Sequence, residues 1–126
     1  MVWYNRDMKI DKDFALFQKV FGSYREMFGL TGYRTYFKHE KLDGAFADIT
    51  IEQPSMVVTV RLNKGHPIEN KAFEDVERSA KHEALHLLLG KLEDLAYDRH
   101  CRKSQIYEAI EEVVFKLEKL IPNNKA

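Results

Sequence analysis

The sequence predicts an α+β domain with an N-terminal helix, a three-stranded and mainly antiparallel sheet, and two further helices. Apolar residues recur every three or four positions near the start of the chain and again in its second half. Between these regions lie three short segments rich in aromatic and β-branched residues, each followed by turn-forming residues. A length of 126 residues suits one domain, which we expect to span residues 1–126.

The first helix is predicted from a stripe of aromatic and aliphatic residues. We expect Asp11 or Asp13 to cap its start and the segment Gly29-Leu30-Thr31-Gly32 to end it, because glycine tolerates the left-handed conformation that closes a helix. The stripe consists of Phe14, Phe17, Val20, Phe21, Tyr24, Met27 and Phe28. Its spacing of three and four residues is typical of a helix with one face on the core.

Three strands are expected over residues 33–41, 45–52 and 56–62. Asp43-Gly44 is a two-residue hairpin signal between the first two strands, and Gln53-Pro54-Ser55 is a turn signal between the last two. These turns predict an antiparallel meander with one buried face.

Two helices complete the predicted fold. The first begins near Pro67 or Asn70, and Gly90 is a plausible end or bend, although the apolar pattern continues for a turn or two beyond it. Its apolar face comprises Ala72, Phe73, Val76, Ala80, Ala84, Leu85, Leu87 and Leu88. Ser104 is a candidate cap for the last helix, whose apolar residues are Ile106, Ile110, Val113, Val114, Leu117, Leu120 and Ile121.

The chemistry of the chain is concentrated in the pentad His82-Glu83-Ala84-Leu85-His86. Helix positions four apart lie on the same face, so the imidazoles of His82 and His86 can reach one metal ion while Glu83 points to the neighbouring edge. Two neutral nitrogen ligands and an adjacent carboxylate are what a zinc-activated water requires. The pentad therefore predicts a zinc site with Glu83 as the base.

A catalytic zinc uses three protein ligands and keeps one position for water, so one more ligand is expected downstream. The candidates are His100 and the three glutamates of the last helix, Glu108, Glu111 and Glu112. Helical phase favours Glu111, which lies beside the apolar stripe, whereas Glu108 and Glu112 lean further toward solvent. The other candidates stay open as alternatives.

The run His-Glu-Ala-Leu-His-Leu-Leu-Leu-Gly followed by a glutamate-bearing helix resembles the minimal, gluzincin-like zincin metallopeptidases, including small ones carried by phages and other mobile elements. In the related antirepressor-type zinc proteases, the third ligand is a glutamate four residues before a Phe and eleven before a Pro. Glu111, Phe115 and Pro122 stand at those spacings here. The SprT-like proteases are a second resemblance, and their third histidine falls about where His100 stands.

The resemblance implies a zinc-dependent metallopeptidase that hydrolyses peptide bonds in a protein or peptide substrate, and small single-domain zincins often act on one specific protein. Glu83 takes a proton from the zinc-activated water, and an extended substrate pairs with an edge strand beside the metal helix. The oxyanion donor is expected among Tyr97, Arg99, His100 and Tyr107. The alternative function is a structural zinc-binding interaction domain without catalysis, and a metal-free α+β binding protein is a third reading.

Composition and charge limit the partners and the cellular compartment that we expect for the protein. A formal net charge of zero gives no argument for nucleic acid or an anionic membrane as partner, and no stretch is apolar enough to span a bilayer. The single Cys101 excludes an internal disulfide, and the first residues do not form a signal peptide, so we expect a cytoplasmic protein. His39 and His66 are interpreted as solvated loop residues rather than ligands.

Overall fold

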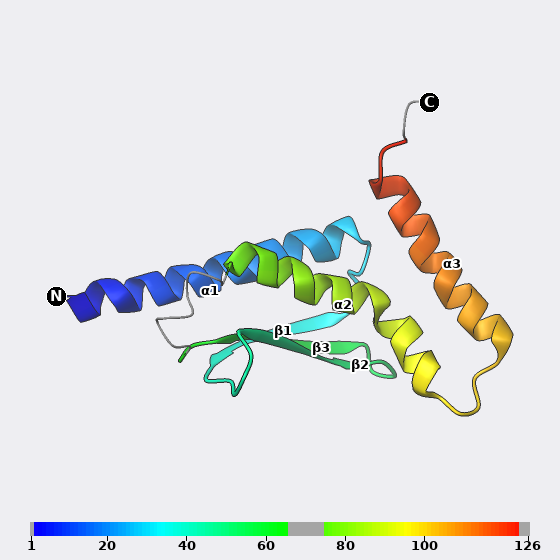
Figure 1. Ribbon diagram of the computed structural model, residues 1–126, viewed down its shortest axis with the longest axis horizontal. Coiled ribbons are helices and arrows are strands. Elements are labelled where there is room, and N and C mark those ends of the chain that lie inside the picture. Colours follow the sequence, from blue (N-terminus) through cyan, green and yellow to red (C-terminus); the bar gives the residue numbers. More distant parts are fainter. Residues whose placement is uncertain (1, 66–74, 124–126) are drawn as a thin grey trace.

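The computed structural model describes residues 2–65 and 75–123, with side chains described from residue 12 (Figure 1). The elements follow in the order α1 (Val2–Met27), β1 (Arg34–Glu40), β2 (Ala47–Glu52), β3 (Val57–Asn63), α2 (Val76–Tyr97) and α3 (Lys103–Leu120). The predicted α+β class and the order of helices and strands are confirmed.

Helix α1 is longer than predicted. It begins at Val2, so neither Asp11 nor Asp13 caps it, because residues 2–10 contain no proline or glycine that would interrupt a helix. Its end is as predicted. Gly29 has φ +68°, its N–H donates to the carbonyl of Glu26 over 3.0 Å, and the next N–H reaches the carbonyl of Arg25 over 2.9 Å.

The sheet is mixed, with strand order β1-β3-β2. β3 pairs in parallel with β1 and antiparallel with β2, so the predicted meander is wrong, and Asp43-Gly44 joins two strands that do not pair. β3 occupies the centre because it is the most apolar strand, and Val58 and Val60 are fully buried. The predicted turn at Gln53-Pro54-Ser55 is confirmed, since it connects the antiparallel neighbours β2 and β3.

Helices α1 and α2 lie side by side over one face of the sheet (Figure 1). The core between these layers contains Phe17, Phe21 and Phe28 of α1, Val58, Val60 and Leu62 of β3, and Ala80, Ala84, Leu87 and Leu88 of α2. Small residues on α2 let the helix approach the sheet closely. β2 is the strand at the edge of the sheet on the α2 side, and this packing sets the distance between that strand and the pentad.

Helix α2 carries the pentad in an uninterrupted segment. The Asp75 side chain caps it by accepting from the N–H of Arg78 over 3.1 Å, whereas the predicted starts at Pro67 and Asn70 lie outside the described residues. Gly90 does not end the helix, which continues to Tyr97. A Cβ at Gly90 would lie 2.9 Å from Nε2 of Gln53, so the glycine permits the close approach of α2 to the end of β2.

Helix α3 turns back from the end of α2 toward the C-terminal end of α1 (Figure 1). It begins at Lys103 after an Arg102 cap, two residues before the position that a Ser104 cap predicts. Lys116 Nζ donates to the carbonyl of Phe28 over 2.6 Å, and Lys91 of α2 pairs with Glu112 over 3.1 Å. Much of the predicted apolar stripe of α3 stays exposed: Ile110, Val114, Leu120 and Ile121.

Candidate metal centre

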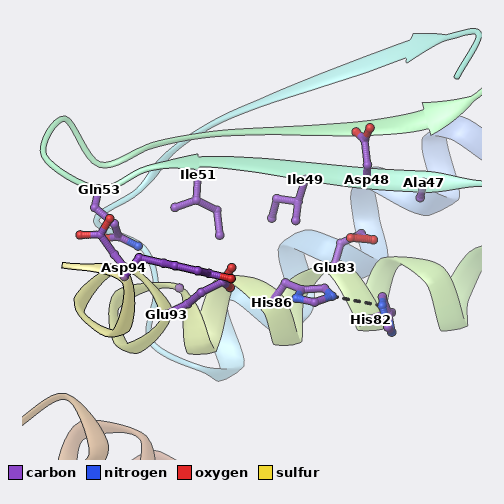
Figure 2. A pocket seen from close by; sticks show the side chains of 12 residues that line it. Ala47, Asp48, Ile49, Ile51, Gln53, His82, Glu83, His86, Glu93 and Asp94 are labelled. Carbon is purple, nitrogen blue, oxygen red and sulfur yellow. Dashed lines mark hydrogen bonds between the residues drawn. The ribbon is translucent and has the colours of Figure 1, made fainter. Parts of the chain in front are cut away.

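The two histidines of the pentad lie close together and share a hydrogen bond between their rings. His82 and His86 both lie exposed on α2, and their Nε2 atoms are 3.2 Å apart (Figure 2). Two nitrogens that share one tetrahedral zinc at about 2.0–2.1 Å lie roughly 3.3–3.4 Å apart. The separation of the two Nε2 atoms is therefore close to that of two adjacent nitrogen ligands of one zinc ion.

Glu83 lies on the buried side of the same helical turn. It is 5% exposed and projects between α2 and β2, next to the histidine pair (Figure 2). Burial raises the pKa of Glu83 above its ordinary value, while the nearby His82 and His86 lower it and the Asp48 carboxylate adds to the rise. A buried carboxylate with a raised pKa beside two imidazoles is suited to accept and return a proton.

A cleft separates α2 from the edge strand β2. It encloses about 520 Å³ and is lined by Ala47, Asp48, Ile49, Ile51 and Gln53 from β2 and its end, and by His82, Glu83, His86, Gly90, Glu93, Asp94 and Tyr97 from α2. Ile49 and Ile51 point from the strand toward the helix, whereas Asp48 points to the opposite face of the sheet (Figure 2). There Arg61 Nε donates to Asp48 over 2.8 Å.

The edge of β2 beside the cleft is open. β3 pairs with β2 on one side only, and no other described strand pairs with it. The backbone N–H and C=O groups on that side of an edge strand can pair with an added extended chain. An edge strand thus lies beside the helix that carries the pentad, although it belongs to a mixed sheet, and its use as a substrate platform stays a prediction.

The predicted third ligand is not brought to the histidine pair. Glu111 is half-buried on α3 and does not line the cleft, and within residues 2–65 and 75–123 no group of three His, Cys, Asp or Glu side chains is placed to hold a metal. Among the alternatives, Glu112 pairs with Lys91, while Glu108 and His100 are exposed. The assignment of Glu111 stays a prediction.

Glu93 lies on the same face of α2 as the two histidines, and sequence reasoning did not single it out. In a straight helix it stands roughly 10 Å beyond His86 along the axis, too far for both to bind one ion. Its i+7 spacing from His86 was the available signal. Glu93 thus extends the cleft rather than completing the metal centre.

The other predicted participants lie apart from the histidines. Of the candidate oxyanion donors, Tyr97 alone lines the cleft, and it stands roughly 16 Å beyond His86 along the helix axis. Tyr107, Arg99 and His100 are exposed outside it. His39 is not a solvated loop residue, because it lies on β1 with its ring stacked on Phe14 at a centroid distance of 4.6 Å, and His66 lies outside the described residues.

Gln53 is a feature of the cleft that the sequence did not indicate. The Tyr33 hydroxyl donates to its Oε1 over 2.9 Å and so orients the amide. Its Nε2 is buried and has no hydrogen-bond acceptor among the described residues. A buried hydrogen-bond donor without an acceptor lowers the stability of a protein by about 1–3 kcal/mol. The Nε2 of Gln53 is such a donor, so one hydrogen bond is missing at this end of the cleft.

No family model, curated protein or solved structure matches this chain. Within the described residues, no helix is long and apolar enough to cross a membrane.

Proposed function

We propose that the protein is a zinc-dependent metallopeptidase that hydrolyses peptide bonds with Glu83 as general base. The observation that supports this most strongly is the close approach of His82 and His86, whose Nε2 atoms lie 3.2 Å apart beside a buried carboxylate. The two histidines would hold a zinc ion through their Nε2 atoms. When bound, the ion would supply a water of lowered pKa and polarise a substrate carbonyl.

Glu83 has the position and the environment of a proton carrier. Because it is buried between α2 and β2, its carboxylate is shielded from bulk water and its pKa is raised. Glu83 accepts a proton from the attacking water and later passes it to the leaving amine. Both transfers take place on the side of Glu83 that faces the cleft. The adjacent edge of β2 binds the substrate backbone by strand addition, which keeps the scissile bond in extended geometry.

The experiment measures the zinc content of the protein and its cleavage of a peptide library. Purified protein is loaded with zinc, its metal content is measured by mass spectrometry, and it is incubated with a proteome-derived peptide library whose cleavage sites are sequenced. We expect about one zinc per chain, with loss of zinc in His82→Ala and in His86→Ala. Glu83→Gln should keep its zinc and lose roughly 10²–10⁴-fold in cleavage rate.

The matched control is Glu77→Gln, which changes an exposed glutamate of the same helix and should leave both zinc content and cleavage unchanged. Wild-type cleavage by Glu83→Gln would contradict the assigned base, and zinc well below one per chain would contradict the metal site. Stoichiometric zinc without cleavage would support the structural zinc domain instead. Glu111→Gln completes the series, since loss of zinc in this variant would confirm the third ligand.

A further inference from the structure

One end of the cleft carries negative charge that no neighbouring cation balances. Glu93 and Asp94 line the cleft near the C-terminal end of α2. Neither carboxylate forms an ion pair or hydrogen bond with another residue that the structure describes. No described lysine or arginine lines the cleft, although the chain as a whole has a net charge of zero.

Among the acidic residues that line the cleft, only Glu93 and Asp94 are exposed, whereas Glu83 is buried beside the histidines. Asp48, at the other end, is turned to the far face of the sheet and bound by Arg61 over 2.8 Å. The nearest lysine along α2, Lys91, pairs with Glu112 over 3.1 Å and lines a different cavity, between α2 and α3. The cleft therefore has a histidine end, which carries His82 and His86, and an acidic end, which carries Glu93 and Asp94.

Two further groups at the acidic end point to a ligand. Tyr97 lines the cleft with 82% of its surface exposed, and an aromatic face attracts cations. Gln53 lies across the cleft from Gly90 of α2, and its buried Nε2 has no acceptor among the described residues. An acceptor on a ligand would complete the hydrogen bonding of Gln53, while the carboxylates and the ring are suited to a cation.

We propose that the acidic end, formed by Glu93, Asp94 and Tyr97, binds a lysine or arginine side chain of a peptide that lies along β2. This preference for a basic residue rests on the proposed peptidase function and specifies the class of peptide that the enzyme would cleave. Glu93 stands roughly 10 Å beyond His86 along the helix. An extended chain advances about 3.3 Å per residue, so the basic residue lies within about three positions of the bond held at the histidines.

A binding measurement tests this without relying on hydrolysis. Two fluorescein-labelled peptides of alanine, threonine and valine differ only in their central pair, Lys-Lys in one and Glu-Glu in the other. Fluorescence anisotropy at low salt gives their affinities for the full chain with zinc and again with chelator. We expect the lysine peptide to bind about three- to tenfold tighter in both conditions, since exposed ion pairs are individually weak.

The double variant Glu93→Gln/Asp94→Asn should abolish this difference between the peptides. Its matched control is Glu77→Gln/Glu118→Gln, which removes the same charge from exposed sites on α2 and α3 and should preserve the difference. Equal affinities for the two peptides in the wild type, or equal loss in both double variants, would overturn the proposal. If the protein binds the lysine peptide more tightly but cleaves no peptide, the proposed peptidase function is contradicted and the proposed binding of basic peptides is supported.

Discussion

Replacing Asn63 by alanine is expected to destabilise the fold by about 3–5 kcal/mol. Asn63 is 8% exposed and ties the connection between β1 and β2 to the end of β3. Its Nδ2 donates to the carbonyls of Leu42 over 2.9 Å and Ala45 over 2.6 Å, and its Oδ1 accepts from the N–H of Leu42 over 3.2 Å and of Gly65 over 2.9 Å. Each of the four hydrogen bonds contributes about 1 kcal/mol to stability, and backbone groups left buried without a partner add to the loss. Together these terms give the expected destabilisation of about 3–5 kcal/mol.

Urea unfolding followed by circular dichroism measures this loss, which should also lower the melting temperature by roughly 10–15 °C. Asn63→Asp keeps the two accepted bonds but turns a carboxylate toward two carbonyl oxygens, so it should also destabilise strongly at neutral pH. Thr50→Ala, at an exposed site on β2, serves as the control and should cost under about 1 kcal/mol. A loss under about 1 kcal/mol for Asn63→Ala would refute the reasoning.

Three other substitutions test the cleft and its supports. Gly90→Ala should destabilise the protein by about 1 kcal/mol despite the better helix propensity of alanine, because the new Cβ meets Gln53 Nε2 at 2.9 Å; a higher melting temperature would contradict this. Glu83→Gln should raise the melting temperature of chelator-treated protein at pH 7.5 but not at pH 4. The raised pKa of Glu83 means that its ionised form costs stability only above the unfolded-state pKa, so an equal gain at both pH values would count against the shift. Lys116→Ala removes the 2.6 Å bond to the carbonyl of Phe28 and should speed hydrogen exchange in α3 while leaving β3 protected; unchanged exchange in α3 would show that this bond does not anchor the helix.

Local patterns in the sequence were enough to predict the helices and strands. The three strands were located to within one or two residues, because β-branched and aromatic runs end at clear turn signals. Strand pairing was not predictable in the same way, since Asp43-Gly44 has the chemistry of a hairpin turn but joins strands separated by β3. The greater apolar content of β3 was the signal for its central position.

The pentad was predictable because two histidines and a glutamate act within a single helical turn. Periodicity alone places His82 and His86 on one face and Glu83 on the next, as the structure has them. Glu111 is a different case, because its position depends on how α3 packs against α2 and against the C-terminal end of α1. That packing uses contacts such as Lys116 with Phe28, which are distant in sequence and have no local pattern.

The open edge of β2 also bears on solubility. An unpaired edge that accepts a peptide can equally accept the same edge of another copy and begin aggregation. If two copies of β2 paired antiparallel about Thr50, each Asp48 would stand opposite Glu52 of the other copy, and like charges directly opposite one another destabilise such a pair. The acidic residues on the outer face of this strand therefore disfavour self-association through its open edge.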